Sequence, residues 1–540
     1  MKPQRPKAEI DWLTDFLIRH RWLLVVPVLL PLSFVFELLM SVRDFYVRTL
    51  RHAPKKHDAR VRDIQEQIRR WHENGSKGRL CTARPPWMSI STRMVKYKRP
   101  ENSIHIPLYD ILSLDVERRV VRVEPRVTVG QLTAYLVPRG WTLPVVPELN
   151  DLTVGGLYVG YGIEVSSHKY GLFSESVQSC DVVLGDGRLV HASPHENADL
   201  FNALPWSQGS LGFVVAMEIA VIPAARFVHV TYHPAHSTRQ ACELMKREAC
   251  RDNPAEFVEG MLFSPREGVV TTGVFSDKAA PGKIHNANRW YAPWFASRSR
   301  RFIAAGGGDE FIPLTHYYQR HVRGMYWESE LIVPFGNRPW FRYLFGWMMP
   351  PKISFLRLTQ GERIKRYYDE KHVVQDALVP VEHLEKTVCY FDRIFEAYPV
   401  WLCPMRVNRK SPRGFVNPDQ RAWGDRPKKP SKRPRSGVPT MAWPVGPTQN
   451  QSKHEMYVDV AVVAVPGPIS RGEDYNAMDG VRRMEQFLLE HRGYQALYSV
   501  TQMSADEFRR MFDCTLYDQV RDRYGLEDVF MDVYEKVRLT

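Results

Sequence analysis

The stretch TVGGLYVGYGIEV, residues 153–165, carries more information about the fold than any other part of the chain. Its four glycines, at 155, 156, 160 and 162, let the backbone approach a ligand closely and aim amides at a phosphate or an isoalloxazine ring. The spacing is GGxxxGxG, which differs from the GxGxxG of a Rossmann turn. On these residues alone, a glycine-rich bulge without a ligand and a cofactor loop fit equally well.

The surrounding residues predict a domain with both helices and strands. A strand at 120–123 leads to a helix that begins at Thr128 in a capping pattern and ends at Gly140. A hairpin turns at 185–187, and a strand-like run at 213–222 follows Ser210-Leu211-Gly212. The segment TARPPWMS (82–89) is a further tight connection. After Pro223 the sequence pattern changes to longer helix-like segments and aromatic-rich loops, so we place a domain boundary near residue 224.

Composition excludes several classes of protein. The seven cysteines of the 540 residues are scattered, odd in number and form no CxxC pair, which argues against a disulfide scaffold and a cysteine zinc site. The net charge is +14, but residues 406–435 hold eleven Lys and Arg against two Asp. The rest of the chain is only mildly basic, so we expect no nucleic-acid partner. We expect this Pro/Lys/Arg-rich insertion, about 405–453, to be disordered; contact with anionic lipid headgroups is the alternative.

The N-terminal region contains an apolar run from Trp22 to Met40. Its nineteen residues would rise about 28 Å as a helix, close to the thickness of a bilayer core. We therefore predict a membrane anchor within residues 1–47, although Glu37 and two prolines also allow an interfacial or re-entrant helix. Basic residues after the run slightly outnumber those before it, which favours a cytosolic body.

Longer phrases carry a resemblance. The loops are similar to those of the vanillyl-alcohol-oxidase type of FAD domain, and the chain as a whole resembles the Δ24-sterol reductase family, which includes the Diminuto/Dwarf1 type of plants. The phrases are GSKGRLCTARPPW (75–87), VVRVEP (120–125), GWTLPVVPELNDLTVGG (140–156), SSHKYGLF (166–173), VPFGNRPWFRYLFGWMMPPKIS (333–354), LTQGE (358–362), KHVVQD (371–376) and WLCP (401–404). They span nearly the whole chain, and the insertion after residue 405 departs from the family pattern.

This resemblance implies an α+β fold. It consists of a two-subdomain FAD-binding domain at 48–224 and an α/β substrate (cap) domain at 225–540, preceded by the N-terminal membrane helix. A C-terminal segment would return to the flavin site. The implied activity is FAD- and NADPH-dependent reduction of the Δ24 double bond in sterol side chains. The implied location is the endoplasmic reticulum membrane, single-pass, where other sterol-pathway membrane enzymes are possible partners.

Carried onto this chain, the resemblance also implies the cofactor site. The loop at 84–89 has no His to tether flavin, so we expect non-covalent FAD; no Rossmann unit exists for NADPH, which we expect to visit the flavin face directly. We expect no metal. The predicted FAD contacts are Thr153, Val154, Gly155, Gly156, Leu157, Tyr158, Val159, Gly160, Tyr161, Gly162, Ile163, Glu164, Val165, Arg84, Ser89 and Gly212.

The reaction requires an acid. Protonation of the alkene at carbon 24 would leave a tertiary cation at carbon 25 for hydride from reduced flavin, so a proton donor must stand in a dry apolar pocket. Residues 311–351 hold eleven aromatic side chains in 41 residues, a density suited to a flat sterol. His316 and Glu328 lie in that stretch, and Tyr498 lies on the returning segment. No motif selects among these three catalytic candidates.

Two other functions remain open on sequence grounds. The FAD loops alone also fit an oxidase of the same fold acting on a hydroxylated apolar substrate. The glycine loops could instead be purely structural in a membrane-anchored scaffold without enzymatic activity. The apolar leader and the length of the family phrases favour the reductase.

Overall fold

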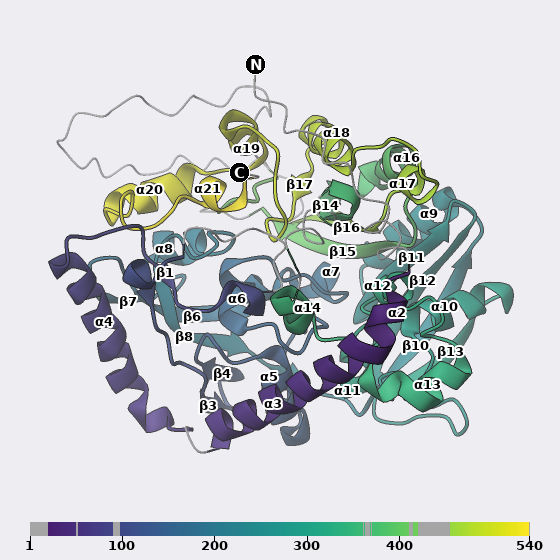
Figure 1. Cartoon of the computed structure of the whole chain (residues 1–540), viewed down its shortest axis with the longest axis horizontal. Helices are drawn as coiled ribbons and strands as arrows, with labels where there is room; N and C mark the ends of the chain where they lie inside the picture. Colours follow the sequence, from purple (N-terminus) through teal and green to yellow (C-terminus); the bar gives the residue numbers. More distant parts are fainter. Residues whose placement is uncertain are drawn as a thin grey trace.

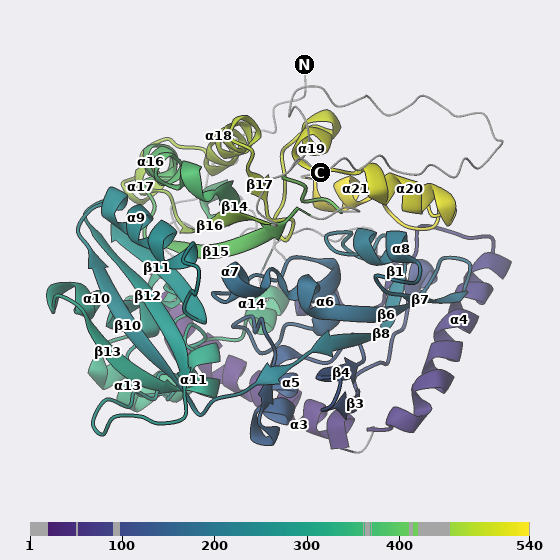
Figure 2. The ribbon, with the colours of Figure 1, turned by 180° about the vertical axis from the view of Figure 1, so that it is seen from behind.

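Two antiparallel β-sheets with helices packed on them form the body of the protein (Figures 1 and 2). The computed structural model describes residues 20–49, 52–89, 98–359, 361, 368, 370–409, 414–418 and 454–538. Because both sheets are antiparallel, both parts of the body are α+β in the strict sense.

The first sheet has five strands and is formed by residues before 224. Their order is β3 (Ile111–Asp115), β4 (Val120–Val123), β8 (Phe213–Ala220), β6 (Val177–Val183) and β7 (Leu189–Ala192). β6 and β7 form the predicted hairpin. Shorter pairs join β1 (Cys81–Thr82) to β2 (Ser103–Ile104) and β5 (Trp141–Thr142) to β9 (Ile222–Pro223).

The helices of this part follow from local sequence. In α4 (His57–Glu73), four apolar residues at helical spacing are buried, namely Val61, Ile64, Ile68 and Trp71. Thr128 caps α5 (Val129–Leu136) by accepting a hydrogen bond from the Gln131 amide at 3.1 Å, as predicted. The helix continues as a short 3₁₀ turn (Val137–Arg139) and ends at Gly140, whose φ of +81° is accessible to glycine. α7 (Ser167–Tyr170) and α8 (Ala198–Ala203) complete this part.

The second sheet has eight strands and begins at residue 227. Their order is β13 (Gly308–Pro313), β10 (Phe227–Ala235), β12 (Glu267–Ser276), β11 (Phe257–Ser264), β15 (Val400–Asn408), β16 (His454–Ala464), β14 (Val373–Pro380) and β17 (Tyr494–Gln495). Helices α9 (Thr238–Ala249), α16 (Leu384–Phe395) and α18 (Ala477–Glu490) pack on one another beside this sheet, and α10 (Phe295–Ala304) packs on β10 and β12. α11 (Leu314–Tyr318), α12 (Glu328–Ile332), α13 (Pro339–Phe345), α14 (Ile353–Thr359) and α17 (Gly467–Ser470) connect these elements.

The C-terminal helices return to the first sheet. They are α19 (Ala505–Met511), α20 (Thr515–Arg523) and α21 (Val533–Val537). The hydroxyl of Tyr517 lies 2.7 Å from that of Ser210, and Arg521 donates to the Ser210 carbonyl at 2.9 Å. The division at residue 224 stays a prediction, which the change of sheet between β9 and β10 supports.

The predicted limits of the basic insertion are wrong at its N-terminal side. Residues 405–408 belong to β15 and pair with β16, because buried and half-buried side chains alternate along them as in a strand with one face on an apolar core. Phe415 is fully buried and its ring lies 5.0 Å from that of Tyr517. The rest of the predicted insertion, 410–413 and 419–453, lies outside the described residues.

The predicted membrane anchor forms one long helix against the body (Figure 1, purple). It comprises α2 (Trp22–Leu24), a π-helical turn (Val25–Leu29) and α3 (Leu30–Thr49). The π turn contains Pro27, which has no N–H to donate and so displaces the helical hydrogen bonds. Within residues 22–47, the most apolar 18-residue window has a mean hydropathy of 2.4, which is apolar enough for a membrane helix. Residues 1–19 of the leader lie outside the described part of the chain.

Candidate active site

A cavity of about 940 Å³ lies where the two sheets meet. One wall comes from the glycine segment and the 82–89 connection, and the other from Tyr326, Trp327, Asp376, Trp401 and Tyr498 of the second part. The volume is at the upper end for ligand sites, so it can hold a large cofactor together with part of a substrate.

The glycine segment begins as a short helix rather than a loop. α6 (Val154–Val159) starts after Thr153, and the chain then runs extended past Gly160 and Gly162. Nine of the thirteen predicted contacts line the cavity: Thr153, Gly155, Gly156, Leu157, Val159, Gly160, Tyr161, Gly162 and Ile163. The other four, Val154, Tyr158, Glu164 and Val165, are buried outside its lining; Val154 and Tyr158 lie four residues apart on one face of α6.

The space available for a side chain differs between Gly156 and Gly160. A Cβ on Gly156 would approach only Thr153 Oγ1, at 3.1 Å. A Cβ on Gly160 would meet the carbonyl oxygen of Gly156 at 2.5 Å, which backbone packing forbids. Gly156 therefore keeps room open toward the cavity, whereas Gly160 is required by the turn itself.

Three basic side chains form a cationic end of the cavity. Arg84 lies 3.3 Å from Thr153 Oγ1, and Lys98 donates to Thr82 Oγ1 at 3.1 Å and to the Arg84 carbonyl at 2.7 Å. Burial, and after it the nearby charge of Arg126, lowers the pKa of Arg84 to about 10. Burial also lowers the pKa of Lys98 to about 8, with Arg84 and Arg126 adding to the effect. Cations crowded in this way favour a bound anion, and a pyrophosphate fits them.

Two carboxyl groups and two tyrosines meet at another part of the cavity. Asp376 on β14 faces Ala461 of β16, which makes Asp459 its diagonal neighbour on the same face of the sheet. Tyr498 donates to Asp376 Oδ1 at 3.0 Å, and Tyr161 donates to Asp459 Oδ2 at 2.9 Å. The Asp376 and Asp459 carboxyl groups are near enough to influence each other's pKa.

Burial sets the protonation of this cluster. It raises the pKa of Asp376 to about 7, and the nearby Glu148 adds to the rise. Burial and the Asp376 carboxyl raise the pKa of Asp459 well above its usual range. Burial and the two carboxyl groups also raise the pKa of Tyr498. The pair therefore retains a proton near neutral pH, and Asp376 is the member of the pair that lines the cavity.

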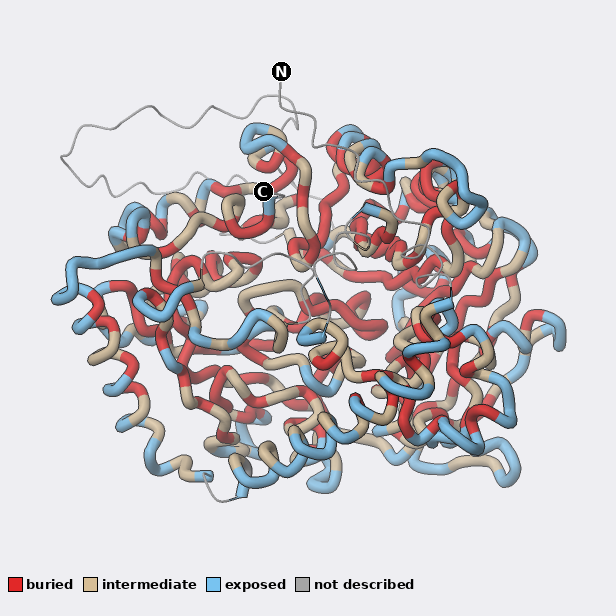
Figure 3. The backbone as a smooth tube through the Cα atoms, in the orientation of Figure 1, coloured by how far each residue is buried: buried red, intermediate tan, exposed pale blue. Residues whose placement is uncertain are grey.

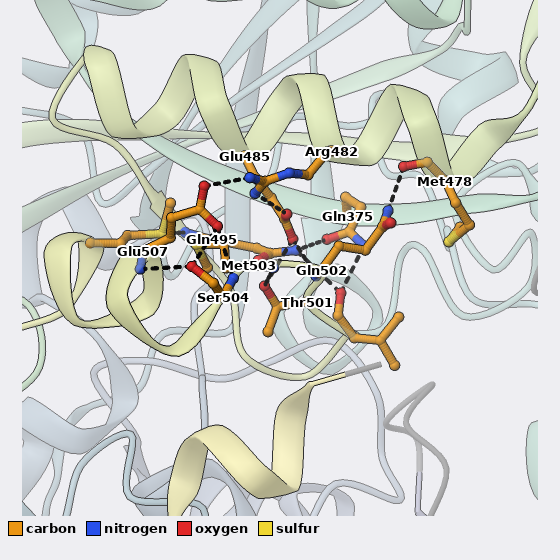
Figure 4. A network of polar contacts seen from close by, with 12 residues as sticks. Gln375, Met478, Arg482, Glu485, Gln495, Thr501, Gln502, Met503, Ser504 and Glu507 are labelled. Atoms are coloured by element: carbon orange, nitrogen blue, oxygen red, sulfur yellow. Dashed lines mark hydrogen bonds and ion pairs between the residues drawn. The ribbon is translucent and has the colours of Figure 1, made fainter. Parts of the chain in front are cut away.

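A network of buried hydrogen bonds holds the segment that carries Tyr498 (Figure 4). The Gln375 side-chain oxygen accepts from Gln495 at 2.7 Å and from Ser499 at 2.8 Å. Glu485 accepts from the Thr501 hydroxyl and the Gln502 amide, each at 2.8 Å. The phenol of Tyr498 is thus fixed from both sides along the chain.

A buried ionic network fixes the end of the glycine segment. Arg320 donates to Glu164 at 3.1 Å and to Glu259 at 2.8 Å. Glu259 also accepts from His321 at 3.0 Å and from the Trp401 indole at 3.1 Å. Since Trp401 lines the cavity, this network joins both of its walls.

The remaining predicted residues separate into two groups. Arg84, Ser89, Gly212 and Tyr498 line the cavity. Among the described residues, its lining includes neither His316 nor Glu328.

These two candidates have other surroundings. His316 lies on α11, where burial and the nearby Arg289 lower its pKa, and Glu328 forms an ion pair with His372 at 3.2 Å. The aromatic stretch that suggested them does contribute Tyr326 and Trp327 to the cavity. Tyr498 is thus the one catalytic candidate that the structure brings to the cavity wall.

Sequence reasoning missed Asp376, Asp459, Lys98, Glu148 and Lys536. A signal existed for Asp459, since it interrupts the otherwise apolar run YVDVAVVAV (457–465). Lys536 lines the cavity and donates to the carbonyls of Gln208 and Gly209, both at 3.1 Å, but nothing local marks it. In the described part of the chain, no group of three or more His, Cys, Asp or Glu could hold a metal ion.

The fold and the site define a flavoprotein. Residues 57–193 match a family described as an FAD binding domain. The Delta(24)-sterol reductase of Homo sapiens is 44% identical over 522 residues, which cover 96% of this chain and 94% of that protein. The Delta(24)-sterol reductase of Pisum sativum is 39% identical and covers 99% and 94%. The chain belongs to the Delta(24)-sterol reductase family. A carbohydrate oxidase of Microdochium nivale is 31% identical, but over only 22% of this chain and 24% of that protein.

Proposed function

We propose that this protein reduces the Δ24 double bond in the side chain of sterols, with FAD as its cofactor and NADPH as the source of electrons. The observation that carries the proposal is one cavity with a glycine-lined cationic end and a buried carboxyl group, Asp376, in its apolar part, where burial raises its pKa to about 7. Membership in the Delta(24)-sterol reductase family supports the substrate.

The residues of the cavity fit FAD. Arg84, Lys98 and Arg126 provide positive charge for the pyrophosphate, and Gly156 leaves room for the ring system beside α6. When bound, FAD reduced by NADPH supplies the hydride for the alkene. The 84–89 connection has no His, so the chain holds FAD without a covalent bond there.

Asp376 supplies the proton in this proposal. An isolated alkene is a weak base, so a carboxylic acid kept protonated near pH 7 is a better donor than a phenol whose pKa is raised. Tyr498, which donates its hydrogen bond to Asp376, then orients the carboxyl group and is a positioning residue. Asp459 helps to keep a proton on the pair.

The apolar part of the cavity excludes water from the reacting bond. Trp327, Trp401, Ala461 and Val463 line it beside Asp376. The indole of Trp327 donates to the Val463 carbonyl at 2.8 Å, which fixes its ring. Rigid aromatic walls of this kind hold a flat sterol and keep a carbocation away from water.

One experiment distinguishes the reductase from the two alternatives, an oxidase of the same fold and a scaffold without enzymatic activity. The purified protein should be yellow, should bleach with NADPH under anaerobic conditions, and should regain its colour when a Δ24 sterol is added. A colourless protein would favour the scaffold. Reoxidation by oxygen but not by the sterol would favour the oxidase, for which the similarity to carbohydrate oxidase covers only 22% of the chain.

The location is also a proposal. We place the protein on the endoplasmic reticulum membrane with its body facing the cytosol, because basic residues after the apolar run slightly outnumber those before it. Other sterol-pathway membrane enzymes remain possible partners. The length and hydropathy of the helix at residues 22–47 support the prediction that it crosses the membrane once. The packing of this helix against the body supports a different arrangement, in which it does not cross the membrane.

A further inference from the structure

The N-terminal helix is packed against the body along one side. Val25 and Leu30 are buried in a cluster with Trp294, Phe341 and Met348. Farther along, the ring of Phe34 lies 4.8 Å from that of Trp347, and the Ser33 hydroxyl accepts from the Lys352 amide at 2.8 Å. Figure 1 shows the helix lying across the body rather than projecting from it. A helix that spans a bilayer cannot keep these contacts, because lipid would surround it.

Many residues of the same helix are exposed (Figure 3), and large apolar residues are among them. Only 17% of its most apolar window is buried. Its exposed large hydrophobic residues are Leu23, Leu24, Val28, Leu32, Val35, Leu38, Leu39, Val42, Phe45 and Tyr46. Soluble proteins rarely expose so many neighbouring apolar side chains.

A second exposed apolar group adjoins this helix. α13 and the turn after it expose Trp340, Tyr343, Leu344 and Trp347. Trp347 contacts Phe34, and Trp340 stacks on Phe335, whose ring lies 5.3 Å from that of Trp22. Tryptophan and tyrosine gather where proteins meet the headgroup region of a bilayer.

We propose that residues 22–47 and α13 form one membrane-docking face, and that the helix lies in the plane of the bilayer surface instead of crossing it. The occupant of this face is lipid, because its aromatic and aliphatic side chains suit the headgroup boundary and the basic residues Arg43, Lys55 and Lys56 at its C-terminal end suit anionic lipid.

The docking face also borders the cavity. Met40 and Arg43, on α3, are part of the cavity lining. A single helix therefore separates the cavity from the docked membrane, and a sterol can pass from lipid to the site without crossing water. This route from lipid to the cavity rests on the proposed function, in which a sterol is the substrate, whereas the docking face does not depend on it.

The test uses the full chain with thiol labels at both ends of the helix. The exposed Cys250 and Cys389 are first replaced by Ser, and His20→Cys or Thr49→Cys is then added. Sealed microsomes are treated with a membrane-impermeant maleimide with and without detergent. We expect both positions to react without detergent, as the exposed Cys250 of the unaltered chain should in a parallel control. Labelling of one end only after detergent is added would show a span and overturn the proposal.

A second measurement examines α13. The pair Trp340→Glu and Leu344→Glu is compared with the pair Val116→Glu and Leu189→Glu, which changes similarly exposed apolar residues in the turn after β3 and on β7. Flotation with phosphatidylcholine–phosphatidylserine vesicles should fall about tenfold or more for the first pair only. Burial of one large apolar side chain in the bilayer strengthens binding by about that factor, and the charged replacement removes this gain. Equal flotation of the two pairs would overturn the proposal.

Both measurements are independent of catalysis. Flavin content and the unfolding transition of each variant show that it is folded. Loss of sterol reduction with normal labelling and flotation would therefore count against the proposed activity and not against the docking face.

Discussion

Replacing Asp376 by Asn tests the proposed proton donor most directly. Asparagine has the shape of aspartate and keeps an oxygen that can accept the Tyr498 hydrogen bond, which is 3.0 Å long in the structure. Its amide cannot deliver an acidic proton. General acid catalysis contributes roughly 10²–10⁴-fold, so sterol reduction should slow by that factor, equal to about 3–5 kcal/mol of barrier.

The pH dependence gives a second signature of Asp376. Burial raises the pKa of this carboxyl to about 7, so it is protonated below that pH and loses its proton above it. The wild-type rate of the sterol step should be constant in mild acid and fall as the pH rises through about 7. In Asp376→Asn this fall should disappear, because no group at that position titrates.

The assay separates the two half-reactions in an anaerobic stopped-flow instrument. Bleaching of the flavin by NADPH should be normal in Asp376→Asn, and only the return of colour with sterol should slow. Asp110→Asn is the control, since Asp110 is equally buried but pairs with Arg60 at 2.7 Å and does not line the cavity. A wild-type rate of reoxidation in Asp376→Asn, with an unchanged pH profile, would refute the assignment.

Four further outcomes follow from the geometry. Gly156→Val should weaken FAD binding by about 1–3 kcal/mol through overpacking, which lowers the flavin-to-protein absorbance ratio and leaves the unfolding midpoint unchanged. Gly160→Val should lower the unfolding midpoint as well, because its side chain would meet backbone. Equal effects of the two variants on the midpoint would contradict this. NMR of the product should show deuterium at carbon 24 when the reaction runs in deuterated water, and at carbon 25 when deuterium-labelled NADPH is used. The reversed positions would exclude protonation at carbon 24. Arg320→Met should lower the free energy of unfolding by about 3–5 kcal/mol, because it removes the guanidinium that two buried carboxyl groups, Glu164 and Glu259, share; a urea titration showing less than about 1 kcal/mol would contradict this. Deletion of residues 421–450 should change turnover by less than about tenfold, since the segment is Pro- and charge-rich; a larger fall would place it in the site.

Local patterns were sufficient for much of the first sheet. Thr128 predicted the start of α5, and the turn at 185–187 predicted the hairpin of β6 and β7. These features depend on residues within one or two turns of each other. The end of β15 was missed because Arg406 and Asn408 are polar, and their place in the sheet depends on pairing with β16, more than forty residues later in the chain.

The catalytic candidates show where local reasoning ends. His316 and Glu328 were chosen because they are titratable residues inside an aromatic stretch, yet α11 and α12 place both outside the cavity lining. Asp376, which does line the cavity, and its buried neighbour Asp459 are 83 positions apart and become neighbours only through the register of β14 and β16.

A physical signal for this pair was nevertheless present in the sequence. Asp376 and Asp459 each interrupt an apolar, strand-like run, VVQDALVP at 373–380 and YVDVAVVAV at 457–465. An ionised carboxylate is costly to bury, so one such residue in an apolar strand indicates either a partner or a retained proton. When two apolar strands each carry one, pairing of the strands can satisfy both by a shared proton, which also provides the acid that an unactivated alkene requires.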